Sequence, residues 1–169
     1  MYIVIQYKLH IIYFFRLAVG SNMTVSLFFG KEDVQMQKAQ YGILRFAKYK
    51  GPEISNIEAH NERKKEKYAS NPDIDNSRGN LNYHLIEPVG KYRAESNRLI
   101  EEYGCRTRKD SVRVVEVLIT ATPEFFKGKK KSEIRAYFQT ALEFIEKYQD
   151  SETILSAVVH MDEKTPHMH

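Results

Sequence analysis

Two short segments at the end of the sequence place the strongest constraint on how this chain can fold. Residues 154–159 are mostly apolar and partly β-branched, which is typical of a buried strand, and His160 follows them. Pro166 fixes a turn, after which His167 and His169 stand two residues apart. Side chains two residues apart on a strand project to the same face. The pattern therefore predicts two adjacent strands inside a sheet, with three imidazoles gathered where they meet.

These three histidines form a predicted set of metal ligands. Glu163 lies on the turn between His160 and His167 and adds a carboxylate near them. A single histidine at a strand end is more often a satisfied polar side chain, but this concentration of ligand types favours a metal site. Three neutral imidazoles suit Zn, Mn, Fe, Co or Ni better than Mg or Ca, which prefer oxygen ligands. The spacing alone does not name the metal.

The composition sets broad limits. The chain has 169 residues, which is enough for one domain with a single core. Hydrophobic residues make up 42% and charged residues 28%, and these fractions argue against wholesale disorder. The net charge of +4 allows a polyanionic partner without requiring one. A single cysteine, Cys105, excludes an internal disulfide framework and indicates a reducing, cytoplasmic location.

Residues 1–35 differ from the rest of the chain. They begin with an apolar and aromatic stretch, but Lys8, His10 and Arg16 interrupt it and leave no run of about 18 uncharged residues for a membrane span. The same charges spoil the apolar centre that a secretory signal peptide needs. We expect residues 1–35 to be an extension of doubtful structure and the domain proper to cover residues 36–169.

The order of the predicted elements defines the fold class. Further strands are expected at residues 39–48, 81–86 and 112–122. Helices are expected at residues 55–68, at residues 91–103 before Gly104, and from Ser132 onward. Turn-forming residues predict an ordered loop over residues 70–80. This order indicates an α+β fold in which helices cover a mainly antiparallel sheet.

Capping residues and an apolar stripe specify two of the helices further. Ser55 and Glu58 have the spacing of a capping box, and Ser132 is expected to cap the last helix. The apolar side of that last helix must face the sheet. It consists of Ile134, Tyr137, Phe138, Ala141, Leu142, Ile145 and Tyr148.

Three motifs in this order resemble a known family. The first is His60-Asn61-Glu62-Arg63, on the predicted helix. The second runs from Asn71-Pro72-Asp73-Ile74-Asp75 through Ser77-Arg78 to Leu81-Asn82-Tyr83, and the third is His160-x-Asp162-Glu163-x-x-Pro166-His167-x-His169. Together they resemble the MobV class of mobilization relaxases, the Pre/Mob plasmid recombination enzymes, over residues 36–169. The chain departs from the family pattern at Asn80, where family members carry a histidine.

The resemblance implies a fold and a reaction. MobV relaxases are HUH endonucleases, which nick one DNA strand at an origin of transfer, keep the 5′ end covalently attached and later rejoin it. The implied fold is a five-stranded antiparallel palm, and the implied partner is plasmid DNA with a single-stranded or hairpin origin, without a small-molecule substrate. Relaxases of this class continue past the metal motif into more sheet and a dimerisation region. We therefore expect this chain to be a fragment that stops at the metal-binding strand.

The resemblance also assigns roles to residues. It places the nucleophile at His60, which would form a phosphohistidine, with Arg63 beside it to hold phosphate or transition-state charge. Tyr83 is the competing nucleophile. Glu163 is either a fourth metal ligand or a base that keeps an imidazole in the correct tautomer. The expected metal, held by His160, His167 and His169, is a divalent ion, Mn²⁺ ahead of Mg²⁺. The expected DNA contacts are Lys64, Arg78, Asn82 and Tyr83.

Two alternatives stay open on the sequence. A three-histidine zinc hydrolase acting on a small substrate explains the metal ligands, but it leaves His60 and Arg63 without a role. An inactive remnant that binds single-stranded DNA weakly is the non-enzymatic alternative. A salt-dependent gel shift on a single-stranded origin oligonucleotide, with and without manganese, separates these readings.

Overall fold

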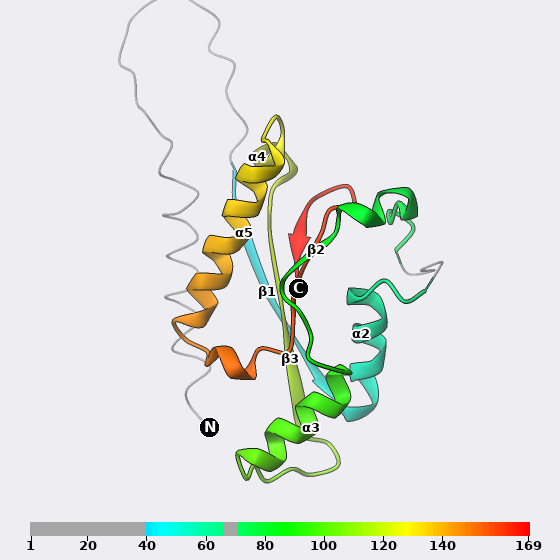
Figure 1. Ribbon diagram of the computed structural model, residues 1–169, viewed down its shortest axis with the longest axis vertical. Coiled ribbons are helices and arrows are strands. Elements are labelled where there is room, and N and C mark those ends of the chain that lie inside the picture. The colour runs from blue at the N-terminus through cyan, green and yellow to red at the C-terminus, as the bar shows by residue number, and fades with distance from the viewer. Residues whose placement is uncertain (1–39, 66–70) are drawn as a thin grey trace, which may run out of the picture.

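A computed structural model of the chain describes residues 40–65 and 71–169 (Figure 1). Within these residues, five strands form one sheet in the order β1-β3-β5-β4-β2, and all paired neighbours run antiparallel. The strands are β1 (Gly42–Lys50), β2 (Tyr83–Ile86), β3 (Val112–Ala121), β4 (Ala157–His160) and β5 (His167–Met168). The predicted α+β class with an antiparallel sheet is therefore confirmed.

The short strand β5 occupies the middle of the sheet. His167 stands opposite Thr120 of β3 on one side and opposite His160 of β4 on the other. The ladder continues past β5, because His169 and Val158 exchange both backbone hydrogen bonds at 3.0 Å. The strand that carries the histidines thus lies inside the sheet, as the apolar segment before His160 predicted.

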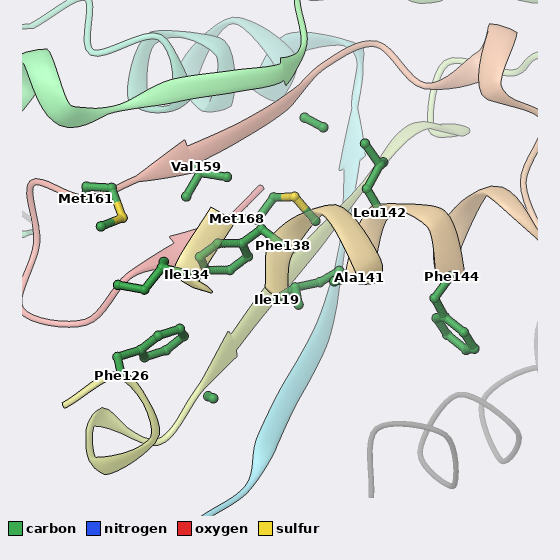
Figure 2. Close-up of a cluster of buried hydrophobic side chains, with 12 residues drawn as sticks. Ile119, Phe126, Ile134, Phe138, Ala141, Leu142, Phe144, Val159, Met161 and Met168 are labelled. Atoms are coloured by element: carbon green, nitrogen blue, oxygen red, sulfur yellow. The ribbon is translucent and has the colours of Figure 1, made fainter. Parts of the chain in front are cut away.

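Alternation along β4 and β5 separates the two faces of the sheet. Val159 and Met168 are paired and lie on one face, whereas the paired His160 and His167 lie on the other. Figure 2 shows Val159 and Met168 pointing into the cluster of buried apolar side chains. The sheet therefore has an apolar face that carries the core and a polar face that carries the histidines.

Helix α5 (Lys131–Glu146) and the short helix α4 (Pro123–Phe126) cover the apolar face. Phe138 is 0% exposed and belongs to the same buried cluster as Ile119 (Figure 2). The predicted apolar stripe of α5 faces this cluster with two differences. Tyr148 is 43% exposed, and Phe144, which the stripe omits, is buried.

Helices α2 (Ile54–Asn61) and α3 (Tyr92–Glu102) lie on the other side of the sheet from α5 (Figure 1). The buried carboxylate of Glu58 accepts a hydrogen bond of 3.0 Å from the backbone N–H of Tyr92, at the first turn of α3. A negative charge is favourable there because of the helix dipole. The hydroxyl of Tyr92 in turn donates to Glu62 at 2.5 Å. These contacts fix the position of α2 relative to α3.

The structure corrects the predicted bounds of the helix at residues 55–68, which begins at Ile54 and ends at Asn61. A 3-10 turn, η1 (Gly51–Glu53), precedes it, and Glu53 accepts a hydrogen bond of 2.8 Å from the backbone N–H of Lys50. Helical geometry therefore starts before Ser55, which does not act as a cap.

Helix α5 shows the same displacement of its start. Glu133 accepts a hydrogen bond of 2.8 Å from the backbone N–H of Lys130, and Ser132 lies inside the helix. In both helical segments an acidic side chain satisfies the N–H three residues before it without a hydroxyl partner. The predicted Ser132 cap is therefore wrong, because the acidic half of the capping box works alone here.

The remaining elements agree with their predictions to within three residues at each end; the strand expected at residues 39–48, for example, is β1 at Gly42–Lys50. The helix expected at residues 91–103 is α3, and Gly104 follows it with φ of +59°. The expected ordered loop contains the 3-10 helix η2 (Asn76–Leu81), and a further one, η3 (Ser151–Thr153), precedes β4. The predicted extension at residues 1–35 lies outside the described residues. No helix within the described ranges combines the length and apolar character needed to cross a membrane.

Phe138→Ala is expected to destabilise the protein by about 3–5 kcal/mol, because it removes a fully buried aromatic ring. Val89→Ala is the control: its side chain is 89% exposed, so its effect should stay within about 0.5 kcal/mol. Urea denaturation followed by circular dichroism measures both. Equal stability of the two variants would contradict the assignment of the core to the α5 face.

Candidate metal centre

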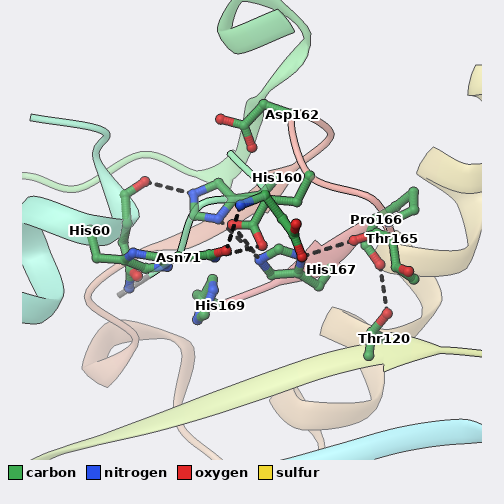
Figure 3. Close-up of polar contacts among 12 residues, drawn as sticks. His60, Asn71, Thr120, His160, Asp162, Thr165, Pro166, His167 and His169 are labelled. Atoms are coloured by element: carbon green, nitrogen blue, oxygen red, sulfur yellow. Dashed lines mark hydrogen bonds and ion pairs between the residues drawn. The ribbon is translucent and has the colours of Figure 1, made fainter. Parts of the chain in front are cut away.

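His160, His167 and His169 form a compact triangle on the polar face of the sheet (Figure 3). Their ring centroids are 5.1 Å apart for His160 and His167, 5.1 Å for His160 and His169, and 5.0 Å for His167 and His169. His160 is 0% and His167 is 9% exposed. The structure therefore brings together all three histidines that the sequence predicted as ligands, in a site shielded from water.

Backbone carbonyl oxygens orient two of these rings. His160 Nε2 lies 2.8 Å from the carbonyl oxygen of Asn61, and His167 Nδ1 lies 3.0 Å from that of Thr165. Each of these nitrogens is the donor, since a carbonyl can only accept. His160 Nδ1 and His167 Nε2 are then both bare, and they face each other at 3.3 Å. Two nitrogen lone pairs at that distance repel each other, and a cation bound between the two nitrogens would remove this repulsion.

The third ring is oriented by a carboxylate. His169 Nδ1 lies 3.1 Å from Glu116 Oε1, at ion-pair distance but off the direction of a hydrogen bond. His169 Nε2 is buried and has no hydrogen-bond partner among the described residues. Each histidine thus has one nitrogen directed at an oxygen and one available, which is the usual arrangement of metal-binding histidines. These residues fit a metal ion.

The turn between β4 and β5 is held from both sides. The hydroxyl of Thr120 donates to the carbonyl oxygen of Pro166 at 2.6 Å (Figure 3). Asn71 donates to Glu163 Oε2 at 2.9 Å, and the other carboxylate oxygen lies 3.6 Å from His167 Nε2. Ligand atoms of His160, Glu163 and His167 lie within 4.8 Å of one another. Glu163 is therefore placed where either of its predicted roles could be filled.

Helix α2 adds a fourth histidine to the cluster. The ring centroid of His60 lies 5.7 Å from that of His160 and 5.4 Å from that of His169. Ligand atoms of His60, His160 and His169 also lie within 4.8 Å of one another. His60 therefore lies beside the predicted metal ligands His160 and His169 although it precedes His160 by 100 residues in the sequence.

Arg63 ends helix α2 in an unusual backbone conformation. The N–H of Lys64 bonds to the carbonyl of Ala59 at 3.0 Å and that of Arg63 to the carbonyl of His60 at 3.2 Å, the two bonds of a Schellman motif. Arg63 has φ of +49°, in the left-handed region where glycine is usual. Gly104 holds the equivalent place after α3. His60 and Arg63 are thus adjacent because the helix ends between them.

Ion pairs hold Arg63 in this conformation. Its Nε and Nη2 bond to the two carboxylate oxygens of Asp162, both at 2.8 Å, and Nη2 also bonds to Glu163 at 2.6 Å. Its Nη1 donates to the carbonyl of His60 at 3.2 Å and lies 3.4 Å from the Nε2 of that ring. The guanidinium group, which was predicted to hold phosphate or transition-state charge, is therefore hydrogen-bonded to two carboxylates.

Asp162 is 1% exposed, and sequence reasoning gave it no role. Burial acts to raise its pKa, but hydrogen bonds from Arg63 and Asn82 outweigh burial and lower the pKa to about 2. Asn82 Nδ2 donates to Asp162 at 2.8 Å, and Asn82 Oδ1 accepts the backbone N–H of Met161 at 2.7 Å. Asn82 thus shapes the turn beside the histidines, whereas the sequence predicted a DNA contact.

The other predicted DNA contacts occupy different places. Tyr83 is paired with Val159 on the apolar face, where Arg135 lies 4.7 Å from its ring centroid. The sheet therefore separates Tyr83 from the histidines. Lys64 forms an ion pair with Glu58. Arg78 is exposed but donates to the carbonyl of Met161 at 2.6 Å.

The electrostatics of the site favour the neutral form of three imidazoles. The pKa values of His60, His160 and His167 are all lowered. Burial is the largest cause in each case, and the neighbouring His169 adds to it. Neutral imidazole is the form that binds a metal ion and the form that can act as a nucleophile.

An antiparallel sheet with a histidine-x-histidine motif on its central strand resembles the HUH endonuclease arrangement expected from the sequence. Residues 38–169 match the Mob_Pre family, described as plasmid recombination enzyme. The chain belongs to this family.

Individual relatives agree with this assignment. A plasmid recombination enzyme of Lactiplantibacillus plantarum is 38% identical over 133 residues, which cover 76% of this chain and 37% of the relative. A type 1 plasmid recombination enzyme of Staphylococcus aureus is 37% identical over 134 residues, covering 76% of this chain and 33% of the relative. The chain therefore spans well under half the length of these two relatives.

Solved structures of one relative share the fold. A MobM relaxase domain (MOBV; Mob_Pre), Mn-bound and in complex with 22-nucleotide plasmid pMV158 oriT DNA at pH 5.5, gives a TM-score of 0.69 at 34% identity. The match covers 76% of this chain and 68% of that one. A second Mn-bound MobM complex, with a 3′-thiophosphate oligonucleotide, gives 0.71 at the same identity and coverage.

Arg63→Gly tests whether the ion pairs of Arg63 outweigh its backbone strain at the end of α2. Glycine adopts φ of +49° without strain, but the change strips Asp162 of its bidentate partner. Loss of one member of a buried ion pair typically costs about 3–5 kcal/mol, so net destabilisation is expected in urea denaturation. Arg98→Ala is the control, because Arg98 pairs with Glu95 and Glu102 on the surface and its loss should change stability little. A stabilised Arg63→Gly variant would contradict the account.

Proposed function

We propose that this chain is the DNA-nicking domain of a plasmid relaxase, which cleaves one strand at an origin of transfer and later rejoins it. The observation that carries the proposal is that His60 lies beside His160 and His169, which form a triangle with His167 on the polar face of the sheet. Family membership supports the reaction class, and the similarity to MobM domains bound to oriT DNA supports plasmid origin DNA as the partner.

The proposed cofactor is a divalent metal ion held by His160, His167 and His169. Mn²⁺ is preferred because the similar MobM domains are Mn-bound and because imidazoles suit it better than Mg²⁺. When bound, such an ion supplies Lewis-acid stabilisation of negative charge on phosphate oxygens. Glu163 is proposed as a fourth ligand or as the base that keeps an imidazole in the correct tautomer, and only a ligand should be bonded to manganese in crystals grown with Mn²⁺.

His60 is the proposed nucleophile. Its neutral imidazole forms a nitrogen–phosphorus bond at the scissile phosphate, while the bond from phosphorus to the 3′ oxygen breaks. The 5′ phosphate stays on His60 as a phosphoramidate. The imidazole gives up its ring proton and the 3′ oxygen gains one, so the step is balanced. Rejoining is the reverse reaction with a 3′ hydroxyl.

Arg63 is proposed to support this step as a positioning residue and as a fixed charge. Its contact with the His60 carbonyl ties the side chain to the nucleophile's own residue, and Asp162 and Glu163 hold the guanidinium in place. A charge fixed before the reaction stabilises a developing negative charge without reorganisation. Of the two roles that the sequence left open for Arg63, this one is transition-state charge and not bidentate binding of phosphate.

Substituting both His167 and His169 with alanine should abolish Mn²⁺ binding, because it removes two of three proposed nitrogen ligands. Mn²⁺ at about 100 times its Kd should stabilise the wild type by about 2.7 kcal/mol through mass action, and the double variant not at all. Calorimetry and thermal unfolding with Mn²⁺ or chelator measure this. His84→Ala is the control, because His84 contacts Glu62 and Glu87 instead. Unchanged Mn²⁺ affinity in the double variant would refute the ligand assignment.

The covalent adduct with an origin oligonucleotide should be a phosphoramidate on His60. It should hydrolyse in acid and survive base, whereas a tyrosine ester resists acid. His60→Ala should lose the adduct but keep oligonucleotide and Mn²⁺ binding, and Tyr83→Phe should keep the adduct. A large loss of Mn²⁺ affinity in His60→Ala would instead make His60 a ligand. An acid-stable adduct that disappears in Tyr83→Phe would overturn the assignment.

A salt-dependent gel shift on the same single-stranded oligonucleotide separates the proposal from the two alternatives. A relaxase domain binds and, with Mn²⁺, nicks. Binding without nicking favours a DNA-binding remnant, and the absence of binding favours a hydrolase of small substrates. Weakening of the complex with salt is expected, because contacts to the phosphate backbone release counterions.

A further inference from the structure

We propose that Glu116 is a positioning residue of the metal centre, which keeps His169 in the tautomer with a bare Nε2 and links that ring to helix α2. Glu116 lies on β3, in a strand whose other residues at 112–121 are mostly apolar. The inference rests on the proposed function in so far as the three histidines hold a metal ion. No part of the predicted site included this residue.

The carboxylate of Glu116 has three partners from three different elements. Its Oε1 lies 3.1 Å from His169 Nδ1 and accepts a hydrogen bond of 3.2 Å from Asn61 Nδ2. Its Oε2 accepts a hydrogen bond of 3.0 Å from the hydroxyl of Tyr49 on β1. The side chain is only 13% exposed. A carboxylate held by so many partners presents its Oε1 to His169 in one fixed place.

This arrangement favours one tautomer of a neutral His169. Although the contact lies off the direction of a hydrogen bond, a negatively charged carboxylate 3.1 Å from Nδ1 attracts the proton to that nitrogen, since a carboxylate can only accept. The lone pair is then on Nε2, the buried nitrogen that has no partner in the part of the chain that the structure describes. Without Glu116 nothing in the described structure favours this tautomer, because no other acceptor contacts Nδ1. The carboxylate thus prepares His169 to bind a cation, as outer partners of metal-binding histidines do.

Asn61 connects Glu116 to His160, the second of the proposed metal ligands. Its amide donates to Glu116, and its backbone carbonyl accepts from His160 Nε2 at 2.8 Å. One residue, adjacent to His60 in sequence, therefore connects the carboxylate that orients His169 to the oxygen that orients His160. We infer that Glu116 fixes the end of α2 and two metal ligands relative to one another.

The tautomer is measurable in the metal-free protein. Long-range ¹H–¹⁵N spectra of histidine-labelled chain at fixed pH should show His169 protonated on Nδ1 in the wild type. Glu116→Gln can offer its amide oxygen to the same partners, so this tautomer should persist. Glu116→Met removes the acceptor, and the proton should move to Nε2. Tyr49→Phe removes only the contact with Oε2 and should behave as wild type.

Metal affinity supplies a second readout, which a merely structural role would not move selectively. Calorimetry with MnCl₂ alone should show that Glu116→Gln lowers the Mn²⁺ affinity and that Glu116→Met lowers it further. Both losses should fall within the range of about 10- to 100-fold that is typical for outer partners of metal ligands. Tyr49→Phe should change affinity by less than the Gln variant. If Glu116→Met does not fold, the comparison of Glu116→Gln with Tyr49→Phe still decides.

Two results would overturn the inference: His169 protonated on Nε2 in the wild type, or Mn²⁺ affinity of Glu116→Gln equal to that of the wild type. Failure of the proposed function has a different signature. In that case the wild type would bind no Mn²⁺, while the tautomer of His169 would still depend on Glu116. The two failures are therefore distinguishable in one set of samples.

Discussion

The antiparallel register between β4 and β5 is the constraint on which the rest of the site depends. It sets His160 opposite His167 on one face and Val159 opposite Met168 on the other. A slip of one residue would turn the histidines into the core and expose the apolar pair to water, so burial under α5 selects the register. Packing on one face of the sheet thus fixes the polar chemistry on the other.

At the end of helix α2, beside this site, an ion pair of Arg63 offsets a strained backbone conformation of the same residue. A residue other than glycine in the left-handed region costs roughly 1–2 kcal/mol. Breaking a buried ion pair costs more, typically about 3–5 kcal/mol, so the pairing of Arg63 with Asp162 outweighs the strain. Backbone strain that persists at a site of this kind is usually tied to its function. Here it ends the helix at Asn61 and leaves His60 beside His160 and His169.

The sequence predicted the parts of this structure that depend on local pattern. Alternation around His167 and the apolar run before His160 predicted a central strand and a shared face, and Gly104 predicted the end of α3. The starts of the helices predicted at Ser55 and Ser132 could not be placed correctly, because Glu53 and Glu133 cap without a hydroxyl partner. The roles of Asp162 and Glu116 depend on contacts across the fold, with Arg63 and His169 respectively. One signal was available, because an acidic residue within the apolar strand β3 needs a partner.

The central claim is that three histidines from β4 and β5 hold one metal ion while His60 stays outside its coordination shell as the nucleophile. Anomalous diffraction from crystals of this chain grown with Mn²⁺ tests it most directly. The account predicts one strong manganese peak bonded to one nitrogen each of His160, His167 and His169, with the His60 ring unbonded. A peak bonded to His60 in place of His167, or crystals with no peak among these histidines, would contradict it.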